Sequence, residues 1–229
     1  MDEADAFERR RAQIRLFVQR WRFSLLLAFL TLGLLLQAGV GAAAGGVLAV
    51  DILFGALVLA TAVASEAGRG VIALLAALSL ARIGITTATG GDGAAFAQAS
   101  NVAAAVAIAL LTLGVVLTAL FRRAASGADA LAGAAFGFLL LGLAFALVFI
   151  AVEIAQPGAF RLIEGGGPMA AQLIYFSLIT LTTTGYGDIV AVTPVMRLVS
   201  ALEGAIGDLY LAVLIGRLLG VAFQRRAKF

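Results

Sequence analysis

Six long apolar segments, joined by short polar stretches, constrain this chain more than any other feature of its sequence. A helix needs about 20 mainly apolar residues to cross the hydrocarbon core of a bilayer. The chain is 62% hydrophobic and 13% charged, whereas a soluble domain carries about a quarter charged residues. We therefore predict an all-α integral membrane protein whose six transmembrane helices lie near 23–43, 47–65, 70–90, 101–121, 131–155 and 194–221.

A shorter apolar run, 168–183, separates the fifth segment from the sixth. It is too short to cross a bilayer, it follows the glycines at 165–167, and Pro168 suits the first turn of a helix. Irregular backbone at membrane depth is tolerated only where it is buried in protein or lines a wet cavity. We therefore predict a re-entrant helix followed by a loop.

The basic residues predict the orientation in the membrane. With the N-terminus inside, the cytoplasmic side receives the six arginines of the segment 1–22, whereas the outer side receives Arg161, with Arg197 at the start of the last helix. This is the positive-inside pattern, and it places both termini, including a short tail at 222–229, on the cytoplasmic side of the plasma (inner) membrane. Segment 1–22 is either an amphipathic helix on the membrane surface or a basic flank that only fixes topology. The other cytoplasmic basic residues would be Arg69, Arg122, Arg123, Arg217, Arg225, Arg226 and Lys228.

Several function classes find no support in the sequence. The chain has no cysteine and no histidine, and no arrangement of its residues resembles a catalytic site. The net charge of +3 does not indicate nucleic acid, because the basic residues cluster at the ends of apolar segments. We expect neither an enzyme nor a bound cofactor.

The stretch from Thr180 to Asp188 reads Thr-Leu-Thr-Thr-Thr-Gly-Tyr-Gly-Asp. It resembles the selectivity-filter signature of tetrameric potassium channels, and the resemblance extends over about 131–221. In that family consecutive backbone carbonyls replace the water that a potassium ion has lost. The required backbone alternates in handedness, and glycine reaches positive φ without steric cost. The resemblance places potassium ions at Thr183, Thr184, Gly185 and Tyr186, completes the filter with Gly187, and puts Asp188 at the outer mouth.

The residues before the filter carry the same resemblance. Tyr175 and Phe176 match an aromatic pair that packs around the filter like a cuff, although the family often has two tryptophans there. Thr184 stands where the family usually has valine or isoleucine. We expect its side chain to point away from the ion path, where its hydroxyl holds a water or strengthens the wall, so that selectivity survives.

The last helix adds three candidates. By its distance from the filter, Gly207 matches the hinge glycine of the family, although close helix packing is the alternative. Asp208 would face the water-filled cavity below the filter, where four copies form a negative ring; its alternative is a partner on a neighbouring subunit. Glu203 points about 140° away from Asp208, so we expect it to face the pore helix and brace the filter.

Segments one to four, 23–123, resemble the voltage-sensing domain of six-segment channels, and 124–221 would form the pore domain. The fourth segment, from Asn101 to Phe121, contains no arginine, so the ladder of gating charges is missing and we expect no voltage sensitivity. Asp51 and Arg82 fall at similar depth in antiparallel segments. We predict that they pair, because a lone charge there is costly.

One filter loop per chain supplies a quarter of a pore, so the resemblance implies a homotetramer, with three identical subunits, membrane lipids and potassium ions as partners. The predicted function is passive, potassium-selective conduction. Alternatives are a poorly selective cation channel, a potassium-uptake transporter, and a non-conducting subunit or scaffold. The alanine-rich composition favours a bacterial source.

Overall fold

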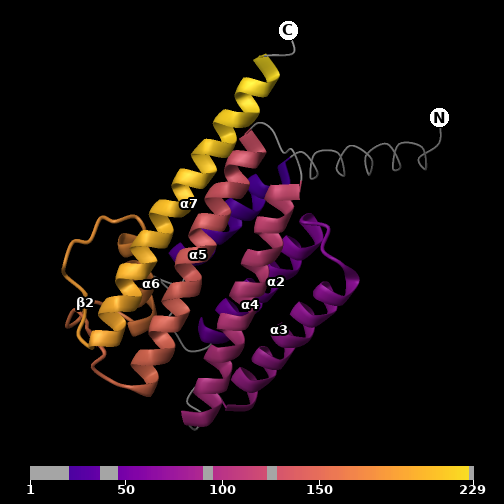
Figure 1. The fold of residues 1–229 in the computed structure, drawn as a ribbon. Coiled ribbons are helices and arrows are strands. Elements are labelled where there is room, and N and C mark those ends of the chain that lie inside the picture. The colour runs from indigo at the N-terminus through magenta and orange to yellow at the C-terminus, as the bar shows by residue number, and fades with distance from the viewer. Residues whose placement is uncertain (1–20, 37–45, 90–94, 123–127, 227–229) are drawn as a thin grey trace, which may run out of the picture.

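A computed structural model describes residues 21–36, 46–89, 95–122 and 128–226 of the chain. The predictions for segment 1–20 and for the end of the first apolar segment lie outside these residues. The described chain is mainly helical (Figure 1), as expected from its apolar segments. Its helices are Trp21–Leu36, α2 Gly46–Ala64, α3 Arg69–Thr89, α4 Ala95–Arg122, α5 Ala128–Ala155, α6 Met169–Leu181 and α7 Pro194–Arg226.

Several helix bounds differ from those expected, and the two largest differences are in α4 and α7. Helix α4 begins at Ala95 rather than near 101, and α7 continues to Arg226 rather than ending near 221. Residues 222–226, expected to be part of a tail, are therefore helical. The expected bounds were placed where polar residues end the apolar segments. They are wrong because an α-helix can continue beyond the apolar core into the polar region of a membrane.

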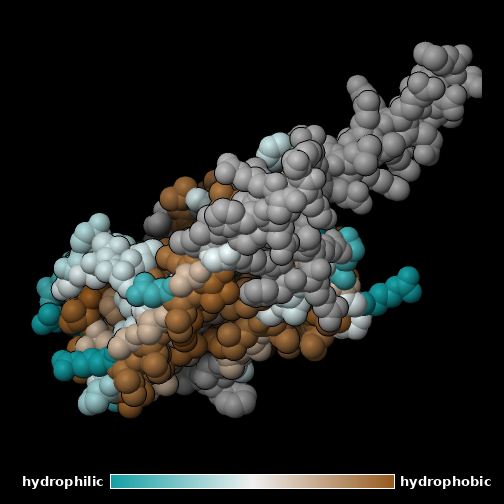
Figure 2. All heavy atoms as spheres, turned by 45° about the horizontal axis from the view of Figure 1, so that its top comes forward, coloured by the Kyte–Doolittle hydropathy of each residue, from teal (hydrophilic) through white to brown (hydrophobic). Residues whose placement is uncertain are grey.

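Three helices of the described residues are long and apolar enough to cross a membrane: Arg69–Ala88, Ser100–Ala119 and Leu131–Ala155. Trp21–Leu36, Asp51–Ala64 and Met169–Leu181 are apolar but shorter. Helix α7 is the longest, with 33 residues, but it carries Arg197, Glu203 and Asp208. The hydropathy surface in Figure 2 shows a broad hydrophobic face over the helices, with hydrophilic residues gathered at its two ends. The chain is thus a membrane protein with several apolar helices, and the count of six spans remains a prediction.

The core lies where α5 meets its neighbours. One cluster joins α5 to the helix Trp21–Leu36 and to α4, with Phe23, Leu30, Val116 and Phe136 almost fully buried. A second cluster packs the end of α5 against α6 and the loops on either side of it. Helix α5 therefore connects the first four helices with the re-entrant segment.

A two-stranded antiparallel sheet encloses the re-entrant segment. Strand β1, Phe160–Arg161, precedes α6, and strand β2, Val190–Ala191, follows the loop at 182–189, with Phe160 opposite Ala191. We call this loop the filter loop, and α6 the pore helix, after the roles predicted for them. Because the sheet joins the two ends of this segment, α6 and the loop after it form one closed unit. In Figure 1 this unit lies at the opposite end of the molecule from the C-terminal end of α7.

Candidate functional site

Helix α6 lies where the sequence predicted a re-entrant helix. Pro168 is its N-cap, with ψ of 138° in the extended region, so the first helical residue is Met169. Gln172, a buried polar residue that the sequence analysis did not single out, ties the helix to the preceding loop. Its Oε1 accepts a hydrogen bond from Ile163 N at 2.8 Å, and its Nε2 donates to Gly167 O at 3.0 Å. The sequence signal for this role was the single amide side chain, Gln172, within an apolar run.

The helix ends at Leu181, two residues earlier than expected, because Thr183 adopts φ of +56°. The backbone then alternates: Gly185 and Gly187 have φ of +52° and +80°, whereas Thr184 and Tyr186 between them do not have positive φ. In a chain that alternates in this way, successive backbone groups of one kind point to the same side. The alternation expected from the two glycines is therefore present, and it begins at Thr183.

The start of the loop is fastened to the end of α6. Ile179 O accepts hydrogen bonds from Thr184 N at 2.8 Å and from Gly185 N at 3.1 Å. The Thr184 hydroxyl lies 3.0 Å from the Thr182 hydroxyl, so it has a partner within its own chain. These bonds hold the N–H groups of Thr184 and Gly185 toward the helix.

Tyr175 and Phe176, the expected aromatic pair, make different contacts. Tyr175 Oη donates a hydrogen bond to Asp188 Oδ2 at 2.7 Å, and this bond is the main reason that the pKa of Asp188 lies below its usual value. Phe176 instead packs against Phe149 and Phe160, with ring centroids 5.5 and 5.4 Å away. One ring thus tethers the outer mouth, and the other joins the pore helix to α5.

A buried polar group lies behind the filter. Glu203 has no exposed surface, and its Oε1 is hydrogen-bonded to the Ser177 hydroxyl, which also lies 2.6 Å from Gly142 O. A serine hydroxyl has one hydrogen, so it cannot donate to both oxygens. Ser177 therefore satisfies one of these two oxygens as a donor, and the buried Glu203 Oε2 has no hydrogen-bond partner among the described residues. Glu203 therefore faces the pore helix, as expected, and links α7 through α6 to α5.

Gly207 lies where α7 packs closely against the pore helix. A Cβ atom at this position would be 2.2 Å from Leu181 O. Only glycine fits there, because real Cβ atoms do not come within 3.0 Å of such an atom. Helix α7 is continuous through this position. Close packing, the alternative to the hinge, is thus sufficient reason for glycine, and the hinge remains a prediction.

Asp208 lies on another side of α7. Its side chain is exposed in the single chain, whereas Glu203 and Gly207 are buried against the pore helix. Neighbouring positions on the exposed side are apolar, including Leu209 and Val213, which are 65% and 55% exposed. This side of α7 is therefore available to a cavity or to another subunit.

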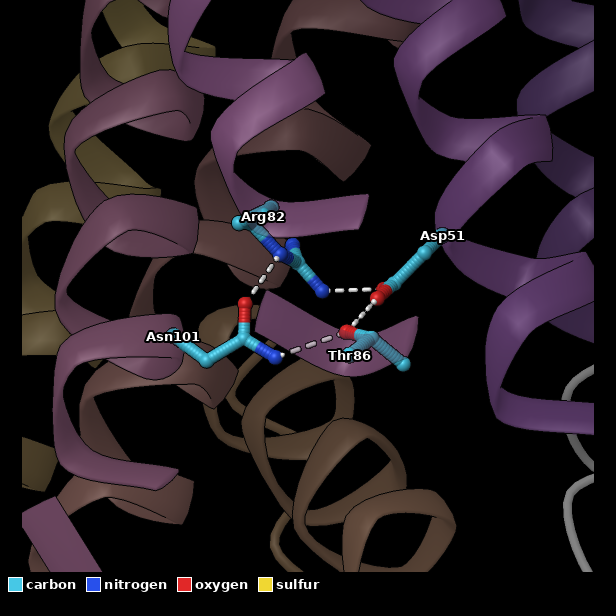
Figure 3. Close-up of polar contacts among 4 residues, drawn as sticks. All are labelled: Asp51, Arg82, Thr86 and Asn101. Carbon is cyan, nitrogen blue, oxygen red and sulfur yellow. Dashed lines mark hydrogen bonds and ion pairs between the residues drawn. The ribbon is translucent and has the colours of Figure 1, made fainter. Parts of the chain in front are cut away.

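Asp51 and Arg82, the charges predicted to pair, are in contact (Figure 3): Arg82 Nη2 donates to Asp51 Oδ1. Two residues that the sequence analysis did not include complete the group. Thr86 Oγ1 donates to Asp51 Oδ2 at 2.7 Å, and Asn101 accepts from Arg82 Nε at 3.1 Å and donates to Thr86 Oγ1 at 2.9 Å. The pair is thus part of a network that joins α2, α3 and α4.

The described residues contain no group of three or more histidine, cysteine, aspartate or glutamate side chains placed to hold a metal ion. Oxygen atoms of the backbone and of threonine hydroxyls are the groups that the filter loop offers.

Parts of the chain are similar in sequence to known proteins. The profile of a family described as "Ion channel" matches residues 138–224, which is less than half of the chain. A stretch of 66 residues, 29% of this chain, is 44% identical to a protein named two pore potassium channel c from Oryza sativa subsp. japonica. The match spans 14% of that relative's length.

No solved structure is significantly similar to the chain. The family match, residues 138–224, includes most of α5, all of α6, the filter loop and nearly all of α7. The relative is likewise named as a channel. The two matches support an ion channel, a class of protein that conducts ions and is not an enzyme.

Proposed function

We propose that the chain is one subunit of a homotetrameric, potassium-selective channel that conducts passively. The observation that carries the proposal is the alternating backbone at 183–187, which follows a re-entrant helix and is exposed in the single chain. One such loop cannot surround an ion, whereas four copies around an axis can. The similarity to an ion-channel family and to a relative named as a potassium channel supports the same conclusion.

Selectivity would come from the carbonyl oxygens of the filter. A potassium ion enters only if the oxygens that replace its hydration water compensate for the loss of that water. The carbonyls of Thr183, Thr184, Gly185 and Tyr186 would supply these oxygens, with the Thr183 hydroxyl at the cytoplasmic end. Gly187 and Asp188 would form the outer exit.

The exposed side of α7 would line the pore or contact the neighbouring subunit. A carboxylate that faces lipid is costly, and Asp208 shares this side with Leu209 and Val213. A water-filled cavity on the axis removes that cost. Four Asp208 side chains would then concentrate cations below the filter.

The topology proposed here has six spans, with both termini on the cytoplasmic side of the inner membrane. Conduction would not depend steeply on voltage. Moving one charge through 100 mV supplies about 2.3 kcal/mol, and Asn101 to Phe121 contains no arginine to carry such a charge.

Flux into proteoliposomes tests this proposal. The purified chain, shown to be tetrameric by native mass measurement, should carry potassium but not sodium, and barium should block the flux. Gly185→Ala should abolish the flux, because alanine is strained at φ of +52°. Gly158→Ala is the matched control, since Gly158 also has positive φ, +88°, and open space around it but lies outside the filter.

The other outcomes separate the alternatives. Equal sodium and potassium flux would indicate a non-selective cation channel. Absence of flux for every cation from a tetrameric, folded protein would indicate a non-conducting subunit. Either result would overturn the proposal.

A further inference from the structure

A cavity of about 330 Å³ lies between the first helices and the pore-forming helices. Its walls come from α2, α3 and α4 on one side and from α5 and the beginning of α6 on the other. Its volume is about ten times the roughly 30 Å³ that a water molecule occupies in the liquid, and it falls at the lower end of the range for ligand-binding cavities, about 300–1,000 Å³. The cavity is therefore large enough for a ligand.

Most of the cavity wall is apolar. Aliphatic and aromatic side chains from α2, α4, α5 and α6 face it. An apolar space of this kind does not hold water well, since water needs two to four polar partners. If the cavity were empty, the side chains of its walls would lack van der Waals contacts on that side. The apolar lining includes Phe54, Leu57, Ile108, Phe136, Leu140 and Ile174.

One end of the cavity is polar, because the network in Figure 3 reaches it through Asp51, Arg82 and Asn101. The described oxygens of this network are engaged: both Asp51 oxygens accept hydrogen bonds, from Arg82 and Thr86, and Asn101 Oδ1 accepts one from Arg82. A guanidinium has five N–H groups, and the described contacts of Arg82 use two of them. The network therefore still offers donors to a ligand, but few acceptors.

These features define the chemistry of the ligand. It has an apolar chain for the larger part of the cavity and a head that bears hydrogen-bond acceptors for the Arg82 side chain, which is 22% exposed. Arginine binds phosphate oxygens particularly well because its N–H groups form a planar fork. Since α3, α4 and α5 each contain a segment long and apolar enough to cross a membrane, the cavity lies where a bilayer supplies its own components.

We propose that this cavity binds a membrane phospholipid, with one acyl chain among the apolar side chains and a phosphate or ester oxygen accepting a hydrogen bond from Arg82. Pro168, Ala170, Ala171 and Ile174 form one wall, so the bound chain touches the helix that carries the filter loop. The site depends on the packing of a single chain and not on conductance.

Lipid binding to the full chain in detergent tests the proposal. Native mass spectrometry counts the molecules of 1-palmitoyl-2-oleoyl phosphatidylglycerol bound during a titration and gives the dissociation constant of the tightest site. Ala105, on α4, lines the cavity and is 4% exposed, so Ala105→Trp should weaken this site by about tenfold or more. Ala103→Trp is the control on the exposed side of the same helix and should bind as the unmodified chain does.

Two further variants keep the test decisive. Ala171→Leu fills the cavity from the α6 wall and serves if Ala105→Trp does not fold. Arg82→Lys keeps the charge beside Asp51 but removes the planar fork, so it should weaken phosphatidylglycerol several-fold and leave the binding of dodecanol unchanged.

The proposal is overturned if both filled-cavity variants bind phosphatidylglycerol as tightly as the unmodified chain. It is also overturned if Arg82→Lys has no effect, since the head would then lie elsewhere, or if dodecanol binds as tightly as the phospholipid, since the site would then be one for single-chain amphiphiles. Because the readout is binding, a chain that fails to conduct can still pass this test.

Discussion

Gly207→Ala is the most direct test of the packing between the last helix and the filter. The added Cβ would be 2.2 Å from Leu181 O and 3.1 Å from Leu181 Cδ1. An ordinary contact requires 3.4 Å or more, so α7 must move away from the pore helix by about 1 Å. The obstructing atom belongs to the backbone next to the filter, and it cannot turn aside as a side chain would.

The size of the effect follows from a matched control. Overpacking of this kind costs about 1–3 kcal/mol, while replacing a helical glycine with alanine gains about 1 kcal/mol. Gly216→Ala, on the same helix, should gain this helix stability without the cost of overpacking, since nothing lies within 4 Å of its added Cβ. The two variants should therefore differ by about 1–3 kcal/mol, which corresponds to roughly 2–12 °C in thermal midpoint for a chain of this size.

The assay heats the purified protein and measures its dissociation by size-exclusion chromatography. Potassium flux is measured on the same variants. Gly207→Ala should melt below Gly216→Ala and should conduct poorly, because the filter is displaced. If Gly207→Ala melts with Gly216→Ala and yet loses its flux, the packing argument fails and Gly207 acts as a hinge. If both stability and flux are unchanged, neither role is correct.

Three further predictions concern the surroundings of the filter. Tyr175→Phe removes the hydrogen bond that lowers the pKa of Asp188. In the unmodified chain the carboxylate of Asp188 contributes stability above its ordinary pKa of 3.8, and this contribution is lost as the pH falls through the lowered pKa. The variant should therefore lose flux at a higher pH than the unmodified chain in an acid titration. Thr184→Val removes the contact with the Thr182 hydroxyl, which does not involve carbonyl oxygens. The potassium-to-sodium flux ratio should therefore stay unchanged, and the melting temperature should fall by a few degrees at most. Glu203→Gln keeps a side chain that can hydrogen-bond to the Ser177 hydroxyl and should fold and conduct, whereas Glu203→Ala removes that partner and should cost about 1–3 kcal/mol of stability. Equal stability of the two Glu203 variants would mean that the contact with Ser177 does not stabilise the fold.

Local features of the sequence were sufficient to predict a helix and a loop between the last two long apolar segments, and the resemblance to potassium-channel filters predicted the alternating backbone of that loop. The apolar run ending near residue 183 is one helix followed by a loop, and the glycine spacing corresponds to the alternating backbone. These properties depend on side-chain size and polarity within a few residues. The same holds for the apolar helices, whose limits differ from expectation mainly where polar residues extend a helix beyond its apolar part.

Contacts between distant residues could be predicted only in part. Similar depth in antiparallel segments was enough to pair Asp51 with Arg82, but the addition of Thr86 and Asn101 depends on how three helices are rotated about their axes. A sequence read one segment at a time contains no measure of that rotation.

The sequence by itself thus determined that the chain enters a membrane, where its irregular loop lies, and that Gly185 and Gly187 take positive φ, because each follows from local hydropathy and from the steric freedom of glycine. The positive φ of Thr183 has no such local cause. Only the tertiary structure decided that Gly207 touches Leu181 O and that Glu203 shares a hydroxyl with Gly142. It also created the lined cavity between the two halves of the chain. Each of these depends on distances of a few ångströms between helices that are far apart in the sequence, and such distances are set when all the side chains pack together.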